Sequence, residues 1–197
     1  HNLRASEIRA LFSVVSRPEV VSLAGGMPNL KDLPLDRLAA SAEKLIRNHG
    51  AQAMQYGSGQ GWEVLRERIT EVMAYDGIVG ADPDDVVVTT GSQQALDLVT
   101  ELFVNPGDVI LAEAPSYVGA LGVFRARQAD IVHVPMDEHG IIPEALEETI
   151  RSVRASGRTI KFIYIIPNYH NPAGVTLSAE RRPIIAEICL REHVLIV

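Results

Sequence analysis

Short β-branched runs alternate with helically spaced apolar residues from residue 85 to residue 197, and this alternation limits the possible folds more than any other feature of the sequence. The runs are VVVTT (86–90), VILAE (109–113), DIVHVP (130–135), IKFIYIIP (160–167) and VLIV (194–197). Between them lie helical patterns at 92–104, 115–127, 143–157 and 178–193. Repeated strand–helix units predict an α/β fold, with a mostly parallel sheet and helices on both of its faces.

Proline, glycine and lysine refine the positions of these expected elements. Pro115 and Pro143 each stand in the first turn of an expected helix, where proline is tolerated because the N–H it lacks would have no partner. Gly157 marks the end of the helix that Pro143 begins. The run at 160–167 is apolar except for Lys161, which is typical of a central parallel strand covered on both faces.

The first 80 residues follow a different pattern. Amphipathic helices are expected at 1–18, 34–50 and 61–77, with the Gly-rich segments VSLAGGMPNL (21–30) and MQYGSGQG (54–61) between them. We therefore expect an N-terminal arm with leading helices over 1–80, followed by a sheet domain over 81–197. The last apolar run has no turn behind it, so we expect the sheet domain to be incomplete in this sequence.

Composition argues against several classes of protein. The formal net charge of -7 argues against non-specific nucleic-acid binding, which needs a basic surface. We find no apolar run of about 18 residues for a membrane span, and HNLRASEIRALF lacks the apolar core of a signal peptide. The six histidines show no metal-ligand spacing. The single Cys189 lies in the apolar pattern IIAEICL, which predicts a buried thiol in a cytoplasmic protein.

Three segments that follow expected strands are the candidate binding site, because ligands of open α/β sheets bind beyond the carboxyl ends of the strands. Each segment is polar or aromatic and rich in turn-forming residues, and all three are expected at one end of the sheet. They are GSQQ (91–94), APSY (114–117) and PNYHNPAG (167–174).

The first of these segments suits a phosphate group. The start of a helix leaves backbone N–H groups free, Gly91 allows the backbone to approach a ligand closely, and Ser92 adds a hydroxyl. The segment matches neither the nucleotide-binding P-loop nor the GxGxxG dinucleotide pattern. A plain helix cap by Ser92 explains the same residues, so both interpretations stay open.

The other two segments also have ordinary explanations. Tyr117 offers a flat ring that could stack on a heteroaromatic group, but a tyrosine at this place can equally be a core or surface residue. Asn168 and Asn171 flank a long turn, and asparagine side chains often do no more than stabilise such turns.

Taken together, five motifs in register resemble a known family. SLAGGMPN, QYGSGQG, TTGSQQALDL, NPGDVILAEAPSY and YIIPNYHNPAGVTLS occur in this order, over nearly the whole chain from about residue 8 onward. They resemble the class I/II aminotransferases among the fold-type I pyridoxal-phosphate (PLP) enzymes, and the branch with 2-aminoadipate and kynurenine aminotransferases is the most similar. The resemblance implies the large domain of that fold, preceded by an N-terminal helical arm.

The resemblance assigns roles in cofactor binding to matching positions. It implies that Ser92 and Gln93, with the backbone of Gly91, hold the cofactor phosphate. Tyr117 would stack on the pyridine ring, and Asn171 would hydrogen-bond the phenolic oxygen of the ring and lie close to the substrate carboxylate.

Three further roles follow from the same resemblance. Tyr56 would reach across a homodimer interface to the phosphate in the partner subunit, which implies shared active sites. The backbone of Gly26 would line the substrate pocket, and Arg9 would contact the substrate side chain.

One group that the family needs is missing from the matched positions. The only lysines are Lys31, Lys44 and Lys161, and none matches the family's Schiff-base lysine, which we expect beyond Val197. The aspartate that pairs with the pyridine nitrogen and the arginine that binds the α-carboxylate are expected there too.

The resemblance implies a PLP-dependent aminotransferase that moves an amino group from an α-amino acid to a 2-oxo acid, with 2-oxoglutarate as the expected acceptor. Two alternatives stay open. The same fold could carry out another PLP reaction, such as β-elimination or decarboxylation, or serve as the PLP-binding domain of a transcription regulator.

Overall fold

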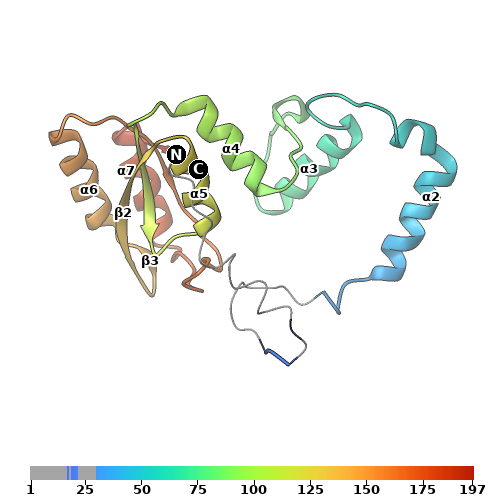
Figure 1. The fold of residues 1–197 in the computed structure, drawn as a ribbon, viewed down its shortest axis with the longest axis horizontal. Helices are drawn as coiled ribbons and strands as arrows, with labels where there is room; N and C mark the ends of the chain where they lie inside the picture. The colour runs from blue at the N-terminus through green and yellow to red at the C-terminus, as the bar shows by residue number, and fades with distance from the viewer. Residues whose placement is uncertain (1–16, 18, 22–29) are drawn as a thin grey trace. The chain divides into compact units, whose positions relative to one another are not determined.

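The computed structural model describes residues 17, 19–21 and 30–197. The expected helix at 1–18 therefore falls almost wholly outside the described residues, as do Arg9 and Gly26. Residues 90–197 form one compact unit, and the described residues before Thr90 belong to a second. The two units are treated separately below (Figure 1).

The unit from Thr90 to Val197 is built on a five-stranded sheet in the order β3-β2-β1-β4-β5. Its strands are β1 (Val109–Ala114), β2 (Asp130–Asp137), β3 (Gly140–Ile141), β4 (Ile160–Tyr164) and β5 (Leu195–Ile196). All neighbouring strands are parallel except β2 and β3. The expected mostly parallel sheet is thus confirmed, and the short antiparallel β3 is an element that the sequence did not predict.

Four helices cover the two faces of this sheet. They are α4 (Ser92–Phe103), α5 (Val118–Ala126), α6 (Pro143–Ala155) and α7 (Arg181–Arg191). Because successive strand residues face opposite sides, Leu111 and Ile163 pack with α6 and α7, whereas Ile110 and Phe162 pack with α4 and α5. In Figure 1, α5 and α6 accordingly lie on opposite sides of β2. This two-faced burial explains why the strands read as continuous apolar runs.

Two of the expected element positions are wrong. The run at 86–90 is extended but belongs to no strand, because it pairs with no strand of the described chain; the Val88 N–H donates instead to the Gln60 carbonyl. Pro115 is not in the first turn of α5, which begins only at Val118 after a loop. The other expected helices and strands of this unit occur with ends shifted by a few residues, and α6 begins at Pro143 as expected.

The second unit contains α2 (Leu35–Ala53), α3 (Glu63–Tyr75) and a 3-10 turn, η1 (Pro83–Asp85), which confirms the helices expected at 34–50 and 61–77. Arg66 of α3 is only 7% exposed and fastens η1 to the helix. Its Nη1 donates to the Pro83 carbonyl at 2.7 Å and to Asp84 Oδ1 at 2.9 Å. Within the described residues, no helix is both long and apolar enough to cross a membrane.

Candidate functional site

Helix α4 begins without a side-chain cap from its serine. Gly91 is the N-cap residue, with a φ of 81° that favours glycine, and Ser92 is the first helical residue. The helix start is stabilised instead by Gln94, whose Oε1 accepts the Thr90 backbone N–H at 2.6 Å and also the Thr90 hydroxyl. The interpretation of Ser92 as a plain cap is therefore wrong, because Ser92 lies one residue too far along the chain.

Backbone N–H groups at the start of α4 are available to an anion. In the described part of the chain, the N–H groups of Ser92 and Gln93 and the Ser92 hydroxyl have no hydrogen-bond acceptor. The aligned peptide dipoles of a 12-residue helix add positive potential at the same place. The Gln93 side chain is partly engaged, because its Nε2 donates one of its two hydrogens to the Gly119 carbonyl at 3.1 Å. The main-chain N–H of Gln93 is the donor that faces no acceptor among the described residues at the helix start.

Tyr117 is held in the loop between β1 and α5. It is half-buried and packs against the apolar cluster beneath α4 and α5. Its ring covers Gly119 so closely that a Cβ there would lie 2.4 Å from Tyr117 Cζ. The neighbouring Ser116 is 6% exposed, and its Oγ has no hydrogen-bond partner. A buried polar atom without a partner calls for an explanation.

The loop after β4 forms a closed turn that presents Asn171. The turn is fastened by three backbone hydrogen bonds: Leu177 N to Pro167 O at 2.9 Å, His170 N to Val175 O at 2.8 Å, and Gly174 N to His170 O at 2.6 Å. Asn168 Oδ1 accepts from Arg182 Nη2 at 2.7 Å, so Asn168 serves the structure of the loop. The Asn171 side chain is exposed and makes no such contact with the described residues.

Beneath this turn lies a buried acid–histidine pair that the sequence did not reveal. Glu113, at the end of β1, is 1% exposed, and His170 is 2% exposed. Glu113 Oε2 lies 3.0 Å from His170 Nε2 and accepts the Ile166 backbone N–H at 2.9 Å. Desolvation by burial raises the pKa of Glu113 to about 7, against the opposing effect of the Ile166 N–H. Burial also lowers the pKa of His170.

Two contacts link the three candidate loops to one another. The Gln93–Gly119 hydrogen bond joins the start of α4 to the start of α5. Glu113 joins the end of β1 to the loop that follows β4. Gly91, Ser92, Gln93, Tyr117 and Asn171 therefore lie on connected loops, and the loops that follow the adjacent strands β1 and β4 emerge at one edge of the sheet.

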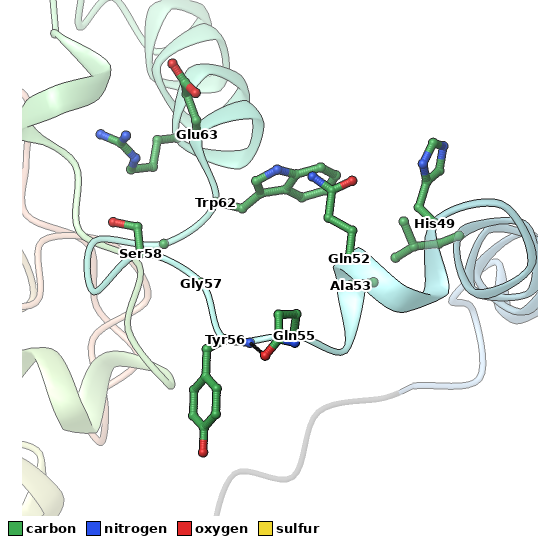
Figure 2. A pocket seen from close by; sticks show the side chains of 12 residues that line it. His49, Gln52, Ala53, Gln55, Tyr56, Gly57, Ser58, Trp62 and Glu63 are labelled. Carbon is green, nitrogen blue, oxygen red and sulfur yellow. Dashed lines mark hydrogen bonds between the residues drawn. The ribbon is translucent and has the colours of Figure 1, made fainter.

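Tyr56 belongs to the second unit and is considered apart from these loops. Its side chain is fully exposed, at 100%. Figure 2 shows its ring directed away from Trp62 and Gln52, although all three residues border the same hollow of about 570 Å³. The structure describes neither Arg9 nor Gly26.

Two other expectations concern sulfur and metals. Cys189 is a free thiol, 1% exposed in the core beneath α7, which confirms the expected buried cysteine. No group of three or more His, Cys, Asp or Glu side chains that could hold a metal ion occurs among the residues the structure describes.

A mostly parallel sheet covered on both faces, with connected loops beyond its strand ends, is the architecture of the fold-type I PLP-dependent transferases. Residues 18–197 match the family described as "Aminotransferase class I and II". The chain belongs to this family.

Individual relatives agree with this assignment. "Aromatic-amino-acid aminotransferase 1" of Thermococcus litoralis is 37% identical, over 99% of this chain and 47% of its own length. "2-aminoadipate transaminase" of Thermus thermophilus is 38% identical, over 91% of this chain and 43% of its own length. The crystal structure of Pyrococcus horikoshii kynurenine aminotransferase with PMP superposes with a TM-score of 0.90 at 35% identity, covering 99% of this chain and 48% of that one. The chain thus spans about half the length of these relatives.

Proposed function

We propose that the whole protein is a PLP-dependent aminotransferase that moves an amino group from an α-amino acid to a 2-oxo acid, with 2-oxoglutarate as the acceptor. The observation that carries this proposal is the connected set of loops at the sheet edge. It combines main-chain N–H donors on α4, the half-buried ring of Tyr117 and the exposed amide of Asn171. Family membership over residues 18–197 supports the same reaction class.

The residues present fit the cofactor. The free N–H groups of Ser92 and Gln93, with the Ser92 hydroxyl, would hold a phosphate dianion at the helix terminus. Tyr117 offers an aromatic face to the ring, and the unpartnered Ser116 Oγ lies in the same loop. The Asn171 amide would donate to the phenolic oxygen and fix the tilt of the ring. When bound, PLP supplies the electron sink for the reaction, and these residues orient it.

None of the three lysines of this chain is placed to bind the cofactor covalently. Lys161 sits near the amino-terminal end of β4, away from the Asn171 turn, and forms an ion pair with Asp108 at 3.3 Å. Lys44 lies on exposed α2, and Lys31 precedes that helix. We therefore place the Schiff-base lysine, the aspartate for the pyridine nitrogen and the arginine for the substrate carboxylate beyond Val197.

We further propose a homodimer with shared active sites, in which Tyr56 donates to the phosphate in the partner subunit. Support comes from the complete exposure of the Tyr56 side chain, because a hydroxyl that contacts a partner subunit cannot be buried within its own chain. Gly26 and Arg9 are proposed to line the substrate pocket, on the basis of the family motif alone.

A product assay on the whole protein tests the reaction class. The protein, reconstituted with PLP, is incubated with a panel of acidic, aromatic and aliphatic amino acids, with and without 2-oxoglutarate. An aminotransferase forms glutamate and the matching keto acid in equal amounts, and only when the acceptor is present. Ammonia without an acceptor would identify β-elimination, and carbon dioxide would identify decarboxylation. PLP binding without turnover of any amino acid would favour the regulatory alternative.

A further inference from the structure

We propose that Glu113 and His170 form a positioning pair that holds the Asn171 turn against the end of β1 and thereby sets the place of the Asn171 amide at the cofactor ring. The inference rests on the proposed function, because it assumes that Asn171 faces PLP. It assigns a role to two residues that stand within the sequence motifs but received no role from the resemblance or from the proposed reaction.

Burial is the first observation. Both side chains are almost fully excluded from solvent, at 1% and 2% exposed. Elsewhere in the described part of this unit, the buried polar side chains are those of Thr100 (0% exposed) and Ser116 (6% exposed), and neither titrates in the ordinary range. Burying a carboxyl group and an imidazole is costly unless each finds a partner. The cost of burying them must therefore be offset by hydrogen bonds that two apolar side chains could not make.

The contacts of the pair show what it fastens. Glu113 Oε2 accepts the N–H of Ile166, where the chain leaves β4, and lies 3.0 Å from His170 Nε2. On the other side of the ring, His170 Nδ1 accepts the Ala173 backbone N–H at 3.2 Å. The imidazole thus spans from β1 to the middle of the turn, and Asn171 lies between the two positions, 170 and 173, that the imidazole connects.

These contacts also fix the tautomer of the imidazole. Since Nδ1 accepts a hydrogen bond, a neutral His170 carries its proton on Nε2, the atom that faces Glu113. The 3.0 Å separation is short, but the N–H direction is not aligned well enough for Nε2 to count as hydrogen-bonded. Tightening of such contacts on ligand binding is common in sites without their ligand.

The surroundings of the pair favour two neutral groups over a carboxylate–imidazolium ion pair. Burial raises the pKa of Glu113 and lowers that of His170, so each group is driven toward its neutral form. The titratable groups around Glu113 are Tyr164 of β4, Tyr117 of the neighbouring loop, and His133 of β2, whose Nδ1 lies 3.2 Å from the Glu113 carbonyl. Among the described residues, no lysine or arginine forms an ion pair with Glu113 that would fix it as a carboxylate.

Variants that mimic one imidazole nitrogen at a time can separate the two contacts of His170, the one with Glu113 and the one with the Ala173 N–H. His170→Gln places an amide near the position of Nε2 and retains a donor toward Glu113. His170→Asn places an amide oxygen near Nδ1 and retains only the acceptor for the Ala173 N–H. Glu113→Gln keeps an acceptor for the Ile166 N–H. Glu113→Ala and His170→Ala each remove one member of the positioning pair and its contacts.

The experiment compares these variants with wild type and Asn171→Ala in the whole PLP-loaded protein. Its main measurement is the pH midpoint of the absorbance change of bound PLP. Asn171→Ala should raise this midpoint, because a donor to the phenolic oxygen is lost. Glu113→Ala and His170→Ala should shift it in the same direction and lower kcat by about ten- to a hundredfold, as expected when a reacting group is misplaced by roughly 1 Å. His170→Gln should recover most of both effects.

A matched control lies at the other end of the same two strands. Asp108 and Lys161 form an ion pair of 3.3 Å beside the starts of β1 and β4. Asp108→Asn should lower thermal stability but leave the absorbance midpoint and kcat unchanged. Hydrogen exchange at the amides of Ala173 and Gly174 in the cofactor-free protein gives a second measurement, in which exchange should quicken in both alanine variants and not in Asp108→Asn.

Each outcome decides the proposal. If the alanine variants only lose stability, as Asp108→Asn does, and their midpoint and amide exchange match wild type, the pair is purely structural and the proposal is wrong. Should either alanine variant fail to fold, His170→Asn, which has no donor toward Glu113, applies the midpoint criterion in its place. If wild type binds no PLP, the proposed function fails. In that case, unchanged amide exchange in the alanine variants would show that the pair does not hold the Asn171 turn either. Faster exchange would show that the pair holds the turn but has no cofactor to position.

Discussion

At the scale of single residues, the position of the Tyr117 ring depends on the absence of a side chain at Gly119. Gly119 has no Cβ, and the Tyr117 ring occupies the space that a Cβ would need. Its carbonyl also accepts the hydrogen bond from Gln93 that joins α5 to α4. The lack of a Cβ at Gly119 therefore permits the observed position of the Tyr117 ring, which is proposed to stack on the cofactor.

The variant Gly119→Ala tests this role. The added methyl group would lie 2.4 Å from Tyr117 Cζ, so the ring must move. An aromatic contact is worth about 0.5–1.5 kcal/mol, so PLP affinity, measured by equilibrium titration of the cofactor-free protein, should fall roughly two- to tenfold. Gly122→Ala is the control, because Gly122 lies in the same helix and nothing stands within 4 Å of a Cβ there. Equal affinity in both variants and wild type would show that the position of the ring does not matter.

Cys189 gives a prediction about reactivity. Its side chain is 1% exposed, and burial raises the pKa of the thiol to about 11. Because the thiolate is the reactive form, a colorimetric thiol reagent at pH 8 should not modify the folded protein at this residue. Full reaction should follow on unfolding in denaturant. Rapid modification of native Cys189, located by mass spectrometry, would mean that the core beneath α7 opens readily.

At the scale of helices and strands, local sequence predicts an element well when its signals lie within it. Helix α6 begins at Pro143, and Gly157 follows its end, as both residues predict. The run at 86–90 has equally strong β-branched character, but a strand also needs a neighbour, and the described residues provide none. The Glu113–Ile166 contact joins residues 53 positions apart, so no periodicity could have revealed it. The one hint in the sequence was Glu113 itself, an acidic residue at the end of an otherwise apolar strand.

The ion pair between β2 and α7 gives a pH-dependent prediction. Arg181 donates to both carboxylate oxygens of Asp137, at 2.6 and 2.8 Å, and also to the Gly140 carbonyl at 3.0 Å. The Arg181 hydrogen bonds, helped by the His139 N–H, lower the pKa of Asp137 from 3.8 to about 2. A depressed folded-state pKa means that the stabilisation is fully present above pH 3.8 and is lost as the pH falls toward 2.

Asp137→Asn should therefore be less stable than wild type at pH 7, with a difference that shrinks between about pH 4 and pH 2. Urea unfolding of both proteins across this range measures it. Glu148→Gln is the control, because Glu148 pairs with Arg151 on an exposed helix face, where such pairs contribute little at any pH. A difference for Asp137→Asn that stayed constant down to pH 2 would contradict the role of the carboxylate charge.

At the scale of the whole molecule, this chain carries part of a proposed site. The positions proposed to contact the phosphate, ring and phenolic oxygen lie between Gly91 and Asn171. The proposed covalent attachment lies elsewhere, and the chain spans about half the length of its relatives. The order of motifs predicted the family, and the assignment of its loops to the cofactor stays a prediction. The geometry of a dimer depends on residues of two chains and does not follow from a single sequence.

Tyr56→Phe tests the proposed sharing of sites between subunits. Because the side chain is fully exposed, loss of its hydroxyl should leave folding stability unchanged. A hydrogen bond to a charged phosphate is worth about 1.5–3 kcal/mol, so the PLP affinity of the dimer should fall roughly tenfold or more. Tyr75→Phe, at another exposed tyrosine, should have no effect. A sedimentation measurement that found a fully active monomer would refute the role of Tyr56.

The absorbance of PLP bound to the whole protein tests the central claim most directly. After reconstitution, the spectrum is recorded before and after addition of an α-amino acid, and again after addition of 2-oxoglutarate. We predict a bound-cofactor band that the amino acid abolishes and the 2-oxo acid restores, as expected if bound PLP would carry the amino group from donor to acceptor. Failure to bind PLP, or a bound band that no amino acid alters, would contradict the assignment.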